Sequence, residues 1–175
     1  KPVNLQAVLE EHCSCNLNWL IEDIMGSDAM LDYAIDDYSP GSGKLRLSNL
    51  GGINAPVQII KRSADDTSAV WIDGFDKDTT IEFRVDGSAE ILLYEGAFNL
   101  DDHPNDNYLR VVDGKVTNKP LKFTMLSGVP DPSKRLINLV PVLAWNYYDR
   151  VMAGVNISNL YFPASNFEFS ITPLL

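Results

Sequence analysis

Basic side chains are scarce in this chain. Lysine and arginine together number 14, against 24 aspartate and glutamate residues, and the formal net charge is −10. Nucleic acids and anionic membrane surfaces are bound through clusters of Lys and Arg, so this balance argues against both as partners. Long apolar runs are lacking too, because no stretch approaches the roughly 20 apolar residues of a membrane-spanning helix.

The front of the chain also lacks the charged and apolar regions of a signal peptide. We therefore expect either that a signal has been removed or that Lys1 is an internal boundary of a longer protein.

Catalytic motifs are missing as well. The sequence has no H-E-x-x-H, no P-loop, no G-x-S-x-G and no paired C-x-x-C, and it holds only two histidines, neither beside an obvious nucleophile. Glu22 and Asp23 are consecutive on a predicted helix, where neighbouring side chains diverge, so they are expected to face solvent. We assign no catalytic, cofactor-binding or metal-binding residue to any position.

The two cysteines, Cys13 and Cys15, are separated by one residue. A disulfide across that spacing is expected to be strained, so the sequence predicts free thiols. Glu11 and His12 lie next to them, but adjacent helical residues point about 100° apart and do not converge on a metal. A frayed helix end is the favoured interpretation over a zinc site.

Residues 97–107, AFNLDDHPNDN, are rich in Asn and Asp. The side chains that could offer oxygen or nitrogen ligands are Asp101, Asp102, His103, Asn105, Asp106 and Asn107. Oxygen ligands suit calcium, but the spacing is not that of an EF-hand and no Glu closes a twelve-residue loop. Asx side chains of such loops more often bond to their own backbone, which is the favoured interpretation here.

Two short helices are predicted within residues 1–26. In the first, Asn4 is the cap and Leu5, Val8 and Leu9 share one face. The second is predicted from Asn16 as cap, the apolar positions Leu17, Leu20, Ile21 and Ile24, and Gly26 as the residue after its end. Leu20, Ile21 and Ile24 are expected to be buried.

From residue 27 the apolar period changes to two, which is typical of strands. The alternating or clustered apolar positions are Leu31, Tyr33, Ile35, Leu45, Leu47, Val57, Ile59, Val70, Ile72, Ile81, Phe83, Val85, Ile91 and Leu93. Turn residues separate them, as at 39–43 and 86–87. Six or seven short strands at this spacing predict a mainly β, antiparallel, immunoglobulin-like sandwich over residues 27–112. Trp19, Trp71 and Trp145 are expected to be core or packing residues.

Residues 113–135 have little periodicity and are predicted to be a linker. Residues 136–175 are predicted to form long hairpin strands of about ten residues, longer than usual. Their expected face comprises Ile137, Leu139, Leu143, Trp145 and Tyr147, followed by a turn at 148–150, a returning strand with Val151, Ala153, Val155 and Ile157, and a third strand with Phe167, Phe169 and Ile171. Such an apolar face predicts self-association through residues 136–175.

Several segments resemble a known family. NLNWLIEDIMGSDAMLDYAID (residues 16–36) resembles the end of the catalytic domain of gluzincin zinc aminopeptidases, the aminopeptidase N-like family, and the start of their β-sandwich. GGINAPVQIIKR (51–62), VWIDGF (70–75) and NDNY (105–108) are similar to later parts of that sandwich. The family's Ile-Asp-Pro segment is absent, and Tyr94-Glu95-Gly96 stands in its place. PVLAWNYYD (141–149) resembles the first strand of a barrel-like domain that follows in bacterial members.

The resemblance implies a non-catalytic C-terminal fragment of a bacterial metallopeptidase. Residues 1–26 would then close an upstream catalytic domain, and residues 136–175 would begin a truncated, barrel-like β domain. Zinc and the general-base Glu of the parent would precede Lys1, with no cofactor in this fragment. The upstream catalytic domain would be its partner, and the location would be the cell envelope, periplasmic or associated with the outer membrane. The alternative is a secreted β-sandwich module that binds glycan or protein.

Overall fold

The described part of the chain is mainly β, with antiparallel sheets, as predicted. A computed structural model describes residues 5–13, 15–94, 101–125, 131–148, 150–160 and 167–175. It divides into two compact units, Lys1–Thr117 and Asn118–Leu175.

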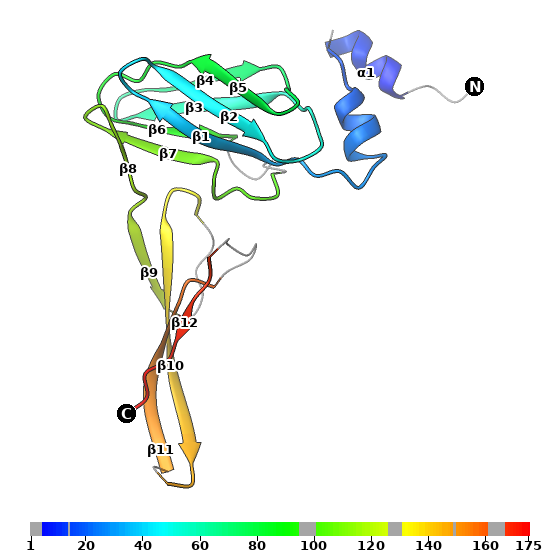
Figure 1. Ribbon diagram of the computed structural model, residues 1–175. Helices are drawn as coiled ribbons and strands as arrows, with labels where there is room; N and C mark the ends of the chain where they lie inside the picture. Colours follow the sequence, from blue (N-terminus) through cyan, green and yellow to red (C-terminus); the bar gives the residue numbers. More distant parts are fainter. Residues whose placement is uncertain (1–4, 14, 95–100, 126–130, 149, 161–166) are drawn as a thin grey trace. The chain divides into compact units, whose positions relative to one another are not determined.

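Two sheets stack face to face in the first unit (Figure 1). The smaller sheet has the order β1-β2-β5, comprising β1 (Tyr33–Ser39), β2 (Lys44–Asn49) and β5 (Asp78–Glu82). The larger sheet has the order β4-β3-β6-β7-β8, comprising β4 (Thr67–Ile72), β3 (Val57–Ser63), β6 (Ala89–Leu93), β7 (Tyr108–Val112) and β8 (Lys115–Thr117). The first, second and fifth strands thus face the sheet formed by the third, fourth, sixth, seventh and eighth, which is an immunoglobulin-like arrangement.

The core lies between these sheets. Its buried apolar side chains are Leu31, Tyr33, Tyr38, Leu45, Leu47, Ile53, Ala55, Val57, Ile59, Phe83, Ile91, Leu93 and Val111. Most of the predicted alternating positions are among them, because residues two apart on a strand face the same side of the sheet. The predicted strand around Ile81, Phe83 and Val85 is shifted, since β5 ends at Glu82.

A β-bulge explains why two tyrosines five residues apart both face the core. The pairing of β1 with β2 changes register between Ile35 and Asp37. The extra residue reverses the alternation, so Tyr33 and Tyr38 are both buried. The Tyr38 hydroxyl accepts a hydrogen bond from the Val85 amide at 3.2 Å, which satisfies its polar atom inside the sandwich.

A buried polar network holds the segment 53–55 in place. The Tyr33 hydroxyl donates to the carbonyl of Ala55 at 3.0 Å, and the Asn49 side-chain amide donates to the carbonyls of Ile53 at 3.1 Å and Phe75 at 2.8 Å. The Tyr33 and Phe75 rings lie 5.0 Å apart between centroids. The turn carrying Phe75 is therefore tied to β1 and β2 by side chains, which strand propensity alone does not predict.

Two helices precede the sandwich, at positions close to those predicted. α1 spans Leu5–Cys13, and η1, a π-helix, spans Trp19–Ile24. Asn4 lies outside the described residues. Asn16 is not the N-cap of η1; its side chain instead accepts a hydrogen bond from the Asn18 amide at 2.8 Å.

Burial of the η1 stripe is only partial. No residue of η1 is fully buried, and Leu20 and Ile21 are half-buried. Trp19 and Ile24 pack against the sandwich core, which confirms contact for Ile24. The predicted i, i+3, i+4 stripe assumes 3.6 residues per turn, and a π-helix rotates that stripe.

The prediction for tryptophan is confirmed at one position and wrong at two. Trp19 packs on the core, whereas Trp71 is 61% and Trp145 is 69% exposed. Trp71 lies on β4, an edge strand of its sheet, and Val70 beside it is exposed as well. Composition cannot distinguish an edge strand from a central one, because both carry the same residue types.

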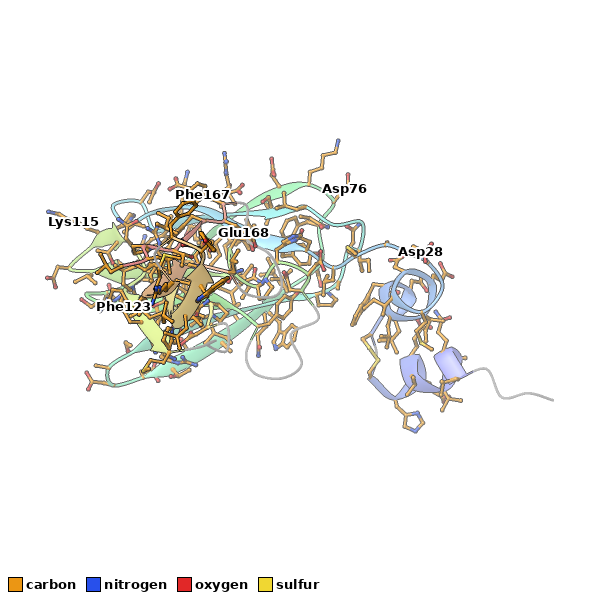
Figure 2. The ribbon with its side chains drawn as sticks, turned by 90° about the horizontal axis from the view of Figure 1, so that it is seen from below. Asp28, Asp76, Lys115, Phe123, Phe167 and Glu168 are labelled. Carbon is orange, nitrogen blue, oxygen red and sulfur yellow. A yellow bond between two sulfur atoms is a disulfide. The ribbon has the colours of Figure 1, made fainter. Side chains whose placement is uncertain are left out.

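The second unit is a single sheet of order β12-β11-β10-β9. It comprises β9 (Leu121–Met125), β10 (Arg135–Asn146), β11 (Arg150–Ser158) and β12 (Ser170–Ile171). β10 and β11 form the predicted long hairpin, in which Leu143 pairs with Ala153 and Trp145 with Val151. The predicted third strand is reduced to β12. Phe123 and Phe167, labelled in Figure 2, are both exposed aromatic side chains of this unit.

The predicted linker 113–135 contains two strands. β8 pairs antiparallel with β7 at the edge of the sandwich, and β9 pairs with β10. The β9–β10 pair is parallel, in contrast to the antiparallel pairing elsewhere. Both strands are short and lie at sheet edges, and short edge strands leave a weak periodic signal in the sequence.

No helix among the described residues has the length and apolar character required to cross a membrane.

Candidate functional site

The two cysteines near the end of α1 are not available as thiolate ligands. Cys13 and Cys15 are joined by a disulfide, so the prediction of free thiols is wrong. Their Cα atoms are 5.2 Å apart, which lies inside the ordinary range for a disulfide despite the short spacing. A disulfide sulfur is not a thiolate ligand. The His12 ring nitrogen Nδ1 lies 2.8 Å from the Val8 carbonyl, one turn earlier in the same helix.

Three carboxylates from distant parts of the sequence meet at the beginning of β1. Asp32 directly precedes β1, while Asp101 and Asp106 belong to the Asn- and Asp-rich loop that leads into β7. One ligand oxygen from each lies within 4.8 Å of the others. We call Asp32, Asp101 and Asp106 the carboxylate cluster.

Backbone hydrogen bonds hold the loop against β1. The Tyr33 amide donates to Asp101 Oδ2 at 2.9 Å, and the Ile35 amide donates to the Asp106 carbonyl at 3.1 Å. The Asp102 amide donates to the Leu31 carbonyl at 2.9 Å. The loop thus continues the edge of β1 and brings its carboxylates to Asp32.

The loop also satisfies part of its own backbone, as predicted. The His103 amide donates to Asp101 Oδ1 at 3.0 Å, which is an Asx turn. The Asp106 amide donates to the His103 carbonyl at 3.3 Å. This local bonding explains the orientation of the Asp101 side chain. It does not explain why Asp32 lies next to the loop, which the sequence does not predict.

His103 lies at the exposed side of the cluster. Its Nδ1 is 2.9 Å from Asp32 Oδ2 and 3.4 Å from Asp102 Oδ2. The hydrogen bond to Asp32 raises the pKa of His103, with further contributions from the charges of Asp32, Asp102 and Asp106. Asp32 is largely buried whereas His103 is half exposed, so the imidazolium offsets the negative charge from the solvent side only.

Burial and mutual repulsion oppose ionisation of the cluster. Burial, together with the negative charges of Asp101 and Asp32, raises the pKa of Asp106 to about 6. Burial also raises the pKa of Asp101, although the Tyr33 and His103 amides that donate to its carboxylate, and the nearby Asn107 side chain, lower it. Carboxylates this close are stabilised by a proton or by a cation, because both remove the repulsion between them.

Several buried oxygens of this region have no hydrogen-bond donor within the part of the chain that the structure describes. They are Asp32 Oδ1, Asp106 Oδ1 and Asn107 Oδ1, and the side-chain nitrogen Nδ2 of Asn107 has no partner there either. Asn107 is 2% exposed and Asp32 is 8% exposed. Buried polar atoms are nearly always paired, so such a group calls for a partner.

Two of the three clustered carboxylates, Asp101 and Asp106, lie in the loop that stands out in the sequence. The loop ligands were recognisable from their composition, but Asp32 was not, because it is one carboxylate in a strand-like stretch. Sixty-eight residues separate Tyr33 from Asp101, to which it donates. Such distant positions come together only when the loop before β7 forms hydrogen bonds with β1 in the folded sandwich.

No protein-family model, curated protein or solved structure matches this chain. The geometry of the described residues therefore carries the functional argument, and the resemblance to zinc aminopeptidases remains a proposal.

Proposed function

We propose that this chain is a non-catalytic structural part of a zinc aminopeptidase-like protein of the cell envelope. It supports the catalytic domain, which holds the zinc, and links it to a further β domain. The arrangement of helices, sandwich and long hairpin is compatible with the order that the resemblance implies. The observation that carries the proposal is the exposed apolar face of α1.

α1 is amphipathic but has nothing buried. Leu5, Val8 and Leu9 lie at i, i+3 and i+4, and all three are exposed. A nine-residue helix is marginal in water unless its apolar face packs on something. Trp19 and Ile24 already attach η1 to the sandwich core, which leaves the apolar face of α1 for an upstream catalytic domain.

A pair of leucines tests this interface. Leu5 is 60% exposed in α1 and Leu50 is 61% exposed in the sandwich, so they match in residue type and exposure. Leu5→Lys should leave the stability of the isolated chain within about 0.5 kcal/mol. In the longer parent protein it should destabilise by about 2 kcal/mol or more, because it buries a charge at the interface.

Leu50→Lys is the control, and it should have little effect in either protein. The measurement is the urea midpoint of both forms. Equal midpoints for Leu5→Lys and wild-type parent would refute the docking of α1. The coding sequence upstream of Lys1 provides a second check, since the proposal requires H-E-x-x-H followed by a distal Glu.

The exposed face of the β10–β11 hairpin supports the linking role. Pro141, Leu143 and Trp145 alternate along β10, and their partners Val155, Ala153 and Val151 lie opposite them on the same face. We propose that this face packs against the remaining strands of a further β domain and that, in this chain alone, a second copy covers it.

Trp145→Glu is expected to abolish this self-association. The charge would be buried in the contact between copies, whereas Trp145 is 69% exposed in one copy and the fold should tolerate the change. Light scattering should show a dimer or larger species for wild type and a monomer for the variant. Trp71→Glu, also at an exposed tryptophan, should leave the assembly unchanged. A monomeric wild type would contradict the proposal.

The alternative, a binding module for glycan or protein, is favoured by one observation. Trp71 on the edge strand β4 is 61% exposed. Exposed tryptophan on a strand is a common anchor in recognition surfaces. A signal peptide ending just before Lys1 in the coding sequence would favour this alternative over the first proposal.

A further inference from the structure

We propose that the carboxylate cluster, together with Asn107, binds one Ca²⁺ ion. The ligands are carboxylate oxygens of Asp32, Asp101 and Asp106 and the side-chain oxygen of Asn107. This inference is independent of the role proposed for the whole chain, because it depends only on the sandwich.

The spacing of the oxygens fits a single ion. Calcium–oxygen distances are about 2.3–2.6 Å, so two ligands of one ion are separated by at most about 4.6–5.2 Å. One oxygen from each of Asp32, Asp101 and Asp106 lies within 4.8 Å of the others. The three carboxylates can therefore reach one cation without a change of backbone.

Asn107 provides an observation independent of the acidic residues. It is 98% buried, and within the described residues neither its Oδ1 nor its Nδ2 has a hydrogen-bond partner. Its side chain lies beside the Asp101 carboxyl, whose pKa it lowers. A neutral amide buried at such a place without a partner is unfavourable, and a cation would satisfy its oxygen.

The donor set selects calcium among common cations. All four side chains offer oxygen, which suits Ca²⁺ and Mg²⁺ better than zinc. Asp101 and Asp106 are held by backbone bonds to β1, so they cannot easily rearrange into the regular octahedron that Mg²⁺ requires. Calcium accepts irregular coordination and gives up its water more readily.

Binding would strengthen the junction between the two sheets. Asp32 leads into β1 of the smaller sheet, and the loop with Asp106 and Asn107 leads into β7 of the larger sheet. A cation held by both would attach the loop to β1 and remove the repulsion among the carboxylates. Calcium would then stabilise the sandwich by linkage to folding.

Direct binding can be followed with Tb³⁺, which replaces Ca²⁺ and is excited by nearby aromatic rings. Tyr33 adjoins the site, since its amide donates to Asp101. The full chain, freed of cations with EDTA, should show sensitised Tb³⁺ emission that Ca²⁺ displaces and Mg²⁺ does not. Calcium alone, at about 100 times its dissociation constant, should raise the melting temperature by about 5 °C or more.

Asp106→Asn should weaken Ca²⁺ binding at least about tenfold, because it removes one of three ligand charges. The shape of the side chain is retained, so the variant should fold, and circular dichroism would check this. Asp32→Asn, from the other end of the site, should weaken binding similarly. Asp102→Asn is the matched control in the same loop, with an exposed carboxylate outside the cluster, and should bind as wild type.

Three results would overturn the proposal. The first is no Tb³⁺ emission and no thermal shift up to about 10 mM Ca²⁺, above the range of weak extracellular sites. The second is unchanged binding by both Asp106→Asn and Asp32→Asn. The third is an equal loss in Asp102→Asn, which would indicate diffuse attraction to an acidic surface instead of a site.

Discussion

Leu47→Ala is expected to lower the free energy of unfolding of the sandwich by about 2–5 kcal/mol. Leu47 is fully buried in β2, the central strand of the smaller sheet. It pairs with Ile35 on one side and Thr79 on the other, so neighbouring strands hold its backbone in place. The surroundings cannot collapse into the space that alanine leaves, and a cavity adds to the lost burial of the side chain.

The measurement is urea unfolding followed by tryptophan fluorescence. Because the chain has two units, the experiment is best made in a Trp145→Phe background, in which the remaining tryptophans, Trp19 and Trp71, report on the first unit. Leu50→Ala is the control, since Leu50 is 61% exposed and its truncation should change stability by less than about 0.5 kcal/mol. Equal midpoints for the two variants would mean that Leu47 is not in a packed core.

Gly74→Ala is expected to destabilise the sandwich by about 2–4 kcal/mol through overpacking and the loss of a buried hydrogen bond. A Cβ at Gly74 would collide with the carbonyl of Asn54 and come within 2.8 Å of the Ala55 carbonyl oxygen. Both contacts are with backbone, which cannot rotate away. Relief requires movement of segment 53–55, whose Ala55 carbonyl accepts the buried Tyr33 hydroxyl.

Gly41→Ala is the control for this substitution. A Cβ at Gly41 has no atom within 4 Å, so the change should be nearly neutral. The same urea experiment compares the two variants. If Gly74→Ala unfolds at the wild-type midpoint, the close approach of the 74–75 turn to segment 53–55 does not exist in solution.

The glycine also shows how a short motif can contain tertiary information. Nothing local in residues 70–75, VWIDGF, explains the glycine at position 74. The structure shows that the glycine is needed because the turn touches segment 53–55, while Phe75 packs on the Tyr33 ring. A single sequence shows that residue 74 is glycine, but it does not show that segment 53–55 lies against it.

Local sequence patterns predict the elements whose signal comes from residues close together in the chain. The period of two at Leu45 and Leu47 and the turn at 39–43 predict strands and a hairpin directly, and Gly43 has the φ of +64° that favours glycine. The long β10–β11 hairpin follows from the same alternation. These features depend on residues close together in the chain, so the pattern contains enough information to place them.

Which strands lie at the edges of sheets, and which distant residues meet, depends on how distant segments of the chain pack together. Trp71 is exposed because β4 ends its sheet, and β8 and β9 form because a neighbouring strand pairs with them. Asp32 reaches Asp101 and Asp106 because β1 and the loop before β7 bond to each other across the sandwich. The physical reason is the same in each case: these outcomes depend on partners far away in the chain, which local period and propensity do not encode.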